Sequence, residues 1–77
     1  EVVLERARLE DGRIWIVRLI VTAQFAGSNA EARRLVQQGA VKIDEETITD
    51  DSYDWPARDN AVLRVGRRRF ARIRLQD

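Results

Sequence analysis

Cysteine and histidine are both absent from this chain of 77 residues. Without cysteine, disulfides and thiolate metal sites are excluded. Without histidine, the chain lacks the commonest general base and the commonest neutral metal ligand. The single lysine, Lys42, lies on a predicted strand among apolar neighbours, with no serine at a motif spacing. We therefore do not expect a catalytic site within this chain.

Long apolar runs are missing as well, and so is an initiating methionine. No run approaches the roughly 20 residues of a membrane span, and no signal-peptide pattern opens the chain. The length suits one small domain and is too short for two. Since the chain starts at Glu1, we expect it to lie inside a longer gene product. Residues 1–10 mix apolar and charged side chains, and we interpret them as a linker in preference to a short edge strand.

The acidic residues in the middle of the chain do not have the pattern of a metal site. They are Asp44, Glu45, Glu46, Asp50 and Asp51. A calcium loop needs alternating oxygen ligands, a central glycine and a late bidentate glutamate, and this segment has none of these at the required spacing. No glycine-rich phosphate loop is present either. We interpret the acidic segment as solvated turns.

The most informative stretch covers residues 28–43 and predicts a helix that leads into a strand. Ser28 and Glu31 have the spacing of a capping box. Gly39 is placed to end the helix in the left-handed conformation. Alternation of apolar residues around Lys42 then predicts a strand over residues 41–43. The apolar face of the helix is expected to hold Ala32, Leu35 and Val36.

The other elements are predicted from apolar runs and turn residues. Asp11 is expected to cap a buried helix over residues 13–23, and residues 24–27 connect it to the second helix. Strands are expected over residues 47–49, 61–65 and 69–75, with an irregular connection over residues 50–60 and a tight turn at Gly66-Arg67. The pattern predicts an α+β fold, with two short helices packed on one face of a small antiparallel or mixed sheet.

The aromatic residues are expected to divide between core and surface. Trp15 lies among apolar neighbours and is predicted to be core, as are Phe25 and Phe70. Tyr53 and Trp55 are predicted to be more exposed, either pinning the loop together with the adjacent proline or stacking on a base.

Charge is unevenly distributed although the formal net charge is only +1. From Asp44 to Asp59 every charge except Arg58 is acidic, and from Asn60 to the residue before Asp77 every charge is basic. Arginine clusters pair with phosphates and release counterions from a nucleic-acid backbone. Composition leaves two interpretations open: nucleic-acid binding, or a solvated surface partly paired with the acidic loop. The candidate residues are Ser28, Asn29, Arg33, Arg34, Gln37, Gln38, Arg67, Arg68 and Arg69, with Arg72 and Arg74 on the last strand.

Two motifs resemble a known family. Residues 28–43 (SNAEARRLVQQGAVKI) resemble the RNA-binding module first described in small-subunit ribosomal protein four. Residues 63–73 (LRVGRRRFARI), together with 14–15 (IW) and 26–29 (AGSN), are similar to the C-terminal domain of bacterial tyrosyl-tRNA synthetase. The resemblance covers about residues 12–75. It implies a ribosomal-protein-four-like RNA-binding fold over residues 12–77, with residues 1–11 as the linker from an upstream synthetase body.

This resemblance implies an accessory domain that holds tRNA(Tyr), including its long variable arm, while the upstream body aminoacylates the tRNA. That body is expected to bind ATP and magnesium, to form a homodimer and to act in the cytoplasm, and no cofactor is expected in this domain. By position, Ser28, Arg33 and Lys42 match the RNA-facing pattern of the family, and Arg67-Arg68-Arg69 matches its basic hairpin. The alternatives are the same module on a pseudouridine synthase or a ribosome-associated factor, and a protein-interaction domain.

Three positions depart from the family pattern. Asn29 stands where a basic residue is common, and Gln24 replaces a usual glycine before the connection between the helices. Asp44-Glu45 replaces a usual Asn-Gly turn and adds negative charge beside the expected surface.

Overall fold

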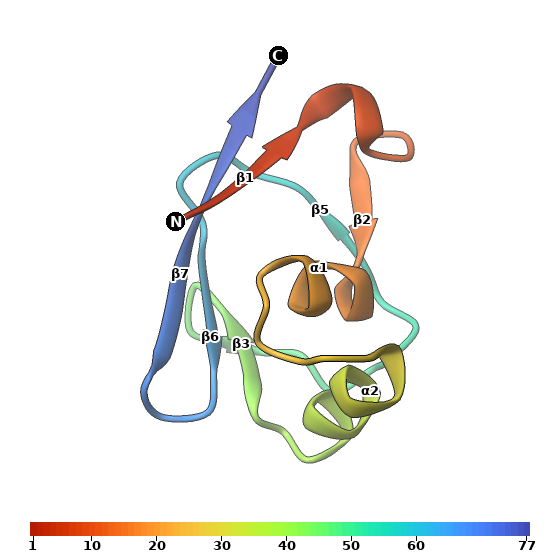
Figure 1. Ribbon diagram of the computed structural model, residues 1–77, viewed down its shortest axis with the longest axis vertical. Helices are drawn as coiled ribbons and strands as arrows, with labels where there is room; N and C mark the ends of the chain where they lie inside the picture. The colour runs from red at the N-terminus through yellow and green to blue at the C-terminus, as the bar shows by residue number, and fades with distance from the viewer.

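A computed structural model describes residues 1–77 as a sheet with two helices on one of its faces (Figure 1). The elements are β1 (Val2–Glu5), the 3-10 helix η1 (Arg6–Arg8), β2 (Arg13–Trp15), α1 (Ile16–Thr22), α2 (Asn29–Gln37), β3 (Val41–Ile43), β4 (Glu46–Thr47), β5 (Asp54–Pro56), β6 (Val62–Val65) and β7 (Arg69–Gln76). This arrangement confirms the predicted α+β fold. Neither α-helix is long and apolar enough to cross a membrane.

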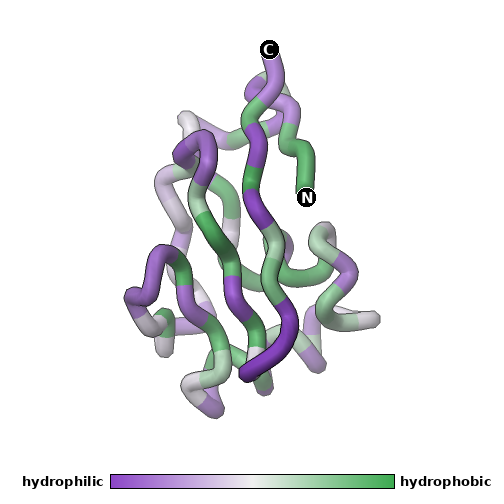
Figure 2. Tube along the Cα trace, turned by 90° about the vertical axis from the view of Figure 1, so that its left-hand side faces the viewer, coloured by the Kyte–Doolittle hydropathy of each residue, from purple (hydrophilic) through white to green (hydrophobic).

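The main sheet has five strands in the order β1-β7-β6-β3-β4, and β2 pairs with β5 in a separate two-stranded sheet. All pairs are antiparallel except β1 with β7, which run parallel. Both helices lie on one side of the strands β3, β6 and β7, and the opposite face carries no helix (Figures 1 and 2).

The core lies between the helices and this sheet, and every buried residue in it is apolar. Helix α1 contributes Ile16, Leu19 and Ile20, each with 0% of its surface exposed. The strands contribute every second residue, such as Leu63 and Ile73, because alternate side chains of a strand point to opposite faces. The face turned away from the helices therefore receives the side chains that do not enter the core, and most of them are polar.

The second helix forms as its sequence predicts. The Ser28 hydroxyl accepts a hydrogen bond from the Glu31 backbone N–H at 3.1 Å, which is the N-cap contact. Ala32 and Val36 are fully buried, and Gly39 follows the helix with a φ of +74°. The helix, its first turn and its glycine end are all confirmed.

The first helix is shorter than predicted, because residues 13–15 form strand β2 and α1 begins at Ile16. Asp11 is not its cap. Asp11 and Gly12 both have positive φ, at +55° and +75°, and form a tight turn closed by two hydrogen bonds between Glu10 and Arg13 of 2.9 and 3.0 Å. An Asp-Gly pair is a strong two-residue hairpin signal, and it outweighs the capping interpretation.

The interpretation of the first residues as a loose linker is wrong. Residues 2–5 form β1, which pairs in parallel with residues 73–76 of β7. Leu4 is only 6% exposed, so this edge strand contributes to the core. The connection of this segment to an upstream body stays a prediction.

Two aromatic residues lie where the sequence did not place them. Trp55 is 2% exposed, because strand β5 pairs with β2 and sets Trp55 opposite Ile14. Phe70 is 58% exposed, because it alternates along β7 with buried Ala71. The connection over residues 50–60 therefore contains a strand, and the second strand of the first hairpin is residues 46–47 in place of 47–49.

Candidate nucleic-acid interface

One flank of α2 is tied to the loop that follows β4. The Arg33 guanidinium lies 5.2 Å from the centre of the Trp15 ring, and Gln37 Nε2 donates to Asp51 Oδ2 at 2.8 Å. The Trp15 indole N–H donates to the Asp51 backbone oxygen at 2.7 Å. Trp15 is half-buried, packed against the core rather than inside it. Arg33 and Gln37 therefore already have partners within the fold.

The other flank of α2 carries Arg34 and, just past the end of the helix, Gln38, which lies beside the hairpin between β6 and β7. Arg34 and Gln38 are exposed and lie one turn apart on this flank. The Gly66 N–H donates to the Ala40 oxygen at 2.8 Å, which holds the hairpin against the start of β3. A shallow depression at this junction is lined by Gln38, Gly39, Ala40, Lys42, Arg64, Gly66 and Arg67. We call the polar side chains here, together with the neighbouring Arg68, the hairpin surface: Gln38, Lys42, Arg64, Arg67 and Arg68.

Three consecutive arginines in the hairpin occupy different environments. Arg67 and Arg68 lie in the turn, are exposed, and have no carboxylate within ion-pair distance. Arg69 is in register with Val65, on the helix side of the sheet. Its guanidinium donates to the Phe25 oxygen at 2.9 Å and lies 5.6 Å from the centre of the Phe25 ring. Arg69 thus fastens the hairpin to the connection between the helices.

Ser28 and Asn29 are exposed but lie at the opposite end of α2 from Gln38. A helix of nine residues is about 14 Å long, so the structure does not bring them into the hairpin surface. Ser28 Oγ already accepts the Glu31 N–H. Their contact with RNA, like that of Arg33, Arg34 and Gln37, stays a prediction.

Arg64 was not among the candidates, although it lies at the centre of the hairpin surface. In the register of the sheet it stands between Lys42 on β3 and Phe70 on β7. Its guanidinium lies 5.2 Å from the centre of the Phe70 ring, and its Nε donates to the Gly66 oxygen at 3.1 Å. Strand alternation is the signal that finds it, because Leu63 and Val65 on either side are apolar.

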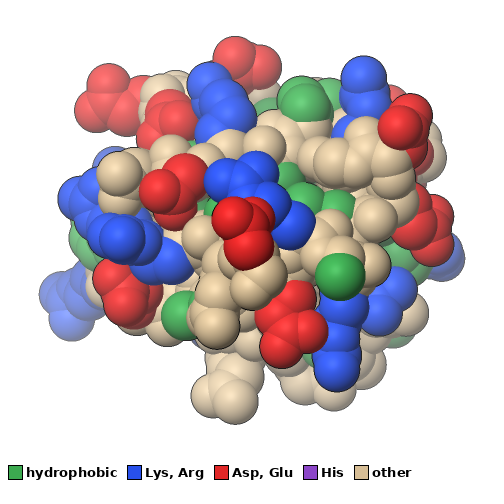
Figure 3. Space-filling model, turned by 90° about the horizontal axis from the view of Figure 1, so that it is seen from above, with side chains coloured by type: hydrophobic (Ala, Val, Ile, Leu, Met, Phe, Trp, Pro, Cys, Tyr) green, Lys and Arg blue, Asp and Glu red, His purple; other side chains and the backbone are tan.

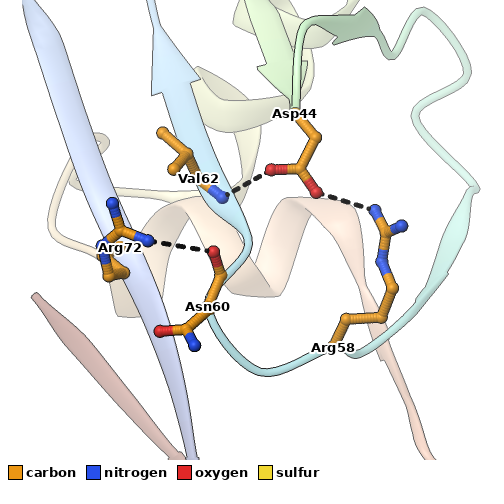
Figure 4. Close-up of polar contacts among 5 residues, drawn as sticks. All are labelled: Asp44, Arg58, Asn60, Val62 and Arg72. Atoms are coloured by element: carbon orange, nitrogen blue, oxygen red, sulfur yellow. Dashed lines mark hydrogen bonds and ion pairs between the residues drawn. The ribbon is translucent and has the colours of Figure 1, made fainter.

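One carboxylate of the acidic turn beside this surface, Asp44, has partners within the fold (Figure 4). Asp44 Oδ1 accepts the Val62 N–H at 2.9 Å, and Asp44 Oδ2 accepts from Arg58 at 3.0 Å. Asp44 and Glu45 have φ values of +49° and +71°, so they form a left-handed turn of the kind for which Asn-Gly is preferred. Of the two added charges, only that of Glu45 lacks a cation partner.

The corner between β5 and β6 is held by hydrogen bonds to β7. Asp59 Oδ1 accepts the Leu75 N–H at 2.9 Å, and the Arg74 guanidinium lies 3.7 Å away. This backbone hydrogen bond, aided by the Arg74 charge, lowers the pKa of Asp59. Arg72 donates to the Asn60 backbone oxygen at 3.3 Å in the same corner (Figure 4).

The end of the molecule that holds η1 differs from the hairpin surface. Figure 3 looks onto this end and shows basic and acidic side chains interspersed. Arg6 pairs with Asp77 at 2.8 Å and Arg8 pairs with Glu5 at 3.1 Å. The arginines of η1 thus have carboxylate partners that Arg67 and Arg68 lack.

Comparison with known proteins places the chain in a family. The family model of the tyrosine–tRNA ligase SYY-like C-terminal domain matches residues 3–73. The chain is 48% identical over 65 residues to the tyrosine–tRNA ligase of Moorella thermoacetica, and 48% identical over 61 residues to that of Syntrophotalea carbinolica. These alignments cover 84% and 79% of this chain but only 16% and 15% of the two relatives, so the chain spans a small part of their length. The chain belongs to the family of C-terminal domains of tyrosine–tRNA ligases.

Proposed function

We propose that this chain is an accessory tRNA-binding domain that holds tRNA(Tyr) for a catalytic body elsewhere in a longer tyrosine–tRNA ligase. The observation that carries the proposal is the hairpin surface. There Lys42, Arg67 and Arg68 gather from β3 and the β6–β7 turn without a carboxylate partner. Membership of the family of tyrosine–tRNA ligase C-terminal domains favours tRNA(Tyr) as the RNA that is bound.

The chemistry of this surface suits a phosphate backbone. Ammonium and guanidinium groups that neutralise phosphates release condensed counterions, and this term is independent of base sequence. Gln38 adds an amide that can donate to phosphate or ribose oxygens at the rim of the same depression. The proposed contact therefore reads the shape and charge of the tRNA, and through its covalent connection raises the effective concentration of tRNA at the catalytic body.

The remaining features of the parent protein are proposed on the names of the relatives, which are tyrosine–tRNA ligases. We assign ATP, magnesium, aminoacylation and homodimer formation to the catalytic body, and a cytoplasmic location to the whole protein. Residues 1–11, although β1 is among them, would lead from that body into the domain. These relatives favour a synthetase as parent over a pseudouridine synthase.

The proposal is tested by fluorescence anisotropy of a labelled tRNA(Tyr) transcript titrated with the 77-residue chain at about 50 mM salt. We expect binding that Lys42→Ala weakens several-fold, because one phosphate contact is lost. Arg8→Ala, which removes the same charge at the η1 end, is the matched control and should leave affinity within twofold.

Two results would contradict the proposal. One is the absence of binding at low salt. The other is an equal effect of Lys42→Ala and Arg8→Ala, which would show that only total charge matters. Competition by a glutamate-rich peptide but not by tRNA would instead support the alternative of a protein-interaction domain.

A further inference from the structure

The outer face of the five-stranded sheet, the one turned away from both helices, is not covered by any other part of the chain (Figures 1 and 2). Alternation along the strands leaves this face with the side chains that do not enter the core. Its members are Val3 and Glu5 on β1, Lys42 on β3, Thr47 on β4, Val62 and Arg64 on β6, and Phe70, Arg72, Arg74 and Gln76 on β7. Basic side chains outnumber the single acidic one, Glu5, which pairs with Arg8, and the face contains one aromatic ring.

Phe70 and Arg64 form a flat, ordered pair at the centre of this face. Phe70 is 58% exposed, which is the highest value among the large apolar side chains of the chain. The Arg64 guanidinium lies over the ring at 5.2 Å and is held by donating to the Gly66 and Arg67 oxygens at 3.1 and 3.5 Å. One side of the ring is therefore fixed against a cation, while the exposed remainder offers a surface on which a second planar group can stack.

Positive charge surrounds this pair within the register of the sheet. Lys42 is directly across from Arg64 and has no carboxylate partner. Asp44 and Glu45 line the same depression as Phe70, and Asp44 has both carboxylate oxygens occupied, by the Val62 N–H and by Arg58. An anionic group that approaches Phe70 therefore meets the free Lys42 ammonium and the Arg64 guanidinium, with Glu45 at the rim as the one carboxylate that has no partner.

The combination of an exposed ring and a free cation fits a nucleotide better than a protein surface. A base can stack on an aromatic or guanidinium plane, and its phosphate can pair with an ammonium group. A docking patch for protein needs a contiguous apolar area, whereas only Val3 and Phe70 are exposed large apolar side chains here, and they lie on different strands.

We propose that the outer face of the sheet binds an unpaired nucleotide of RNA, with its base stacked on the Phe70–Arg64 pair and its phosphate on Lys42. The proposal rests on the proposed tRNA-binding function and extends it. The hairpin surface binds the backbone of structured RNA, and the adjoining sheet face binds a base that is not paired. Arg64 and Lys42 belong to both, so the two contacts form one continuous site.

The test compares two RNA probes and three variants of the 77-residue chain. The probes are a tRNA(Tyr) transcript, which has unpaired bases, and a blunt RNA duplex without any. Phe70→Leu removes the ring, Phe70→Tyr keeps it, and Val3→Ala trims the other exposed apolar side chain of the same face as a matched control. Both positions are exposed, and the melting temperature of each variant verifies folding.

We expect Phe70→Leu to weaken tRNA(Tyr) binding by about 5- to 30-fold, within the range for loss of one stacked base. Its salt dependence should not change, because no charge is removed. Phe70→Tyr should restore the affinity, Val3→Ala should leave it within twofold, and Phe70→Leu should leave duplex binding within twofold.

Equal tRNA(Tyr) affinity of Phe70→Leu and the unaltered chain would overturn this inference while leaving the proposed function intact. Equal weakening of tRNA and duplex would overturn it as well, because the ring would then act on backbone binding in general. If Phe70→Leu lost binding to a glutamate-rich peptide while its RNA affinities stayed unchanged, the face would be a protein-docking site, against the inference. Failure of the unaltered chain to bind either RNA would overturn the proposed function and the inference together.

Discussion

Arg68 and Arg69 are neighbours of the same type, and the structure predicts opposite effects when each is replaced by alanine. Arg68 lies in the exposed turn without a protein partner, so Arg68→Ala should leave the stability of the fold unchanged. Arg69 spans from β7 to the connection between the helices. Arg69→Ala should therefore destabilise the fold.

The size of the Arg69 effect follows from its two contacts. A hydrogen bond from a charged donor contributes roughly 1.5–3 kcal/mol when well shielded, and a cation–π contact about 0.5–1 kcal/mol at an exposed site. Since Arg69 is largely exposed, we expect a combined loss of about 1–2 kcal/mol. For a domain of this length, the melting temperature should fall by roughly 4–16 °C. Arg68→Ala should lie within about 0.5 kcal/mol of the unaltered chain.

The assay combines thermal unfolding, followed by circular dichroism, with tRNA(Tyr) titration well below the melting temperature. Arg68→Ala should make the salt dependence of log affinity shallower by about 0.9, the loss of one phosphate contact, and Arg69→Ala should leave it unchanged. Similar melting temperatures for the two variants would refute the structural role of Arg69. A loss of salt dependence in Arg69→Ala equal to that in Arg68→Ala would refute the division of roles.

Three further predictions concern the turns and caps that hold the interface. Ser28→Ala should cost about 1 kcal/mol in urea unfolding, because the Glu31 N–H loses its cap, and Ser28→Asp should retain the stability. Glu45→Gly should raise the free energy of unfolding by about 0.5–1 kcal/mol, because glycine adopts the left-handed φ of +71° without strain; a decrease would contradict the turn geometry. Asp59 has a lowered pKa in the fold, so its contribution to stability is present above the ordinary carboxyl pKa of about 3.9 and is lost as pH falls through the folded value. Melting temperatures measured from pH 6 to pH 2 should therefore fall less steeply in Asp59→Asn than in the unaltered chain, and parallel curves would rule out this linkage.

The elements that the sequence predicts well are those whose signals are local. Ser28 and Gly39 bound α2 because a cap and a left-handed end depend on a few neighbouring residues. The β6–β7 hairpin follows from alternation and the glycine at its turn. In both cases tertiary packing adds to a preference that is already present in the segment.

The elements that the sequence misplaces depend on partners far along the chain. Trp55 is buried because β5 pairs with β2, about 40 residues earlier, and no signal within the acidic connection reveals that partner. Residues 2–5 form a strand because β7 offers an edge near the other end of the chain. Asp11 is the exception, because its signal is local. The Asp-Gly pair indicates a two-residue turn, but the long apolar run after it favours a helix that begins at this point, and the structure has the turn.

The spatial arrangement of the candidate residues does not follow from their spacing in the sequence. Sequence spacing identifies Arg67, Arg68 and Arg69 as one basic group, yet the sheet places Arg69 on the helix side. It also brings Lys42 beside Arg64, two residues that are separated in the sequence and become neighbours only through the pairing of β3 with β6. Side-chain partners such as the Phe25 oxygen for Arg69 depend on the folded contacts and cannot be read from spacing.

The central claim is that phosphates bind the hairpin surface. Its most direct test is the salt dependence of tRNA(Tyr) affinity for two double variants. Arg67→Ala with Arg68→Ala and Arg6→Ala with Arg8→Ala remove the same charge, from the hairpin turn and from η1 respectively. We expect the slope of log affinity against log salt to become shallower by about 1.8 in the hairpin variant and to stay unchanged in the η1 variant. Equal slopes in the two double variants would contradict the claim.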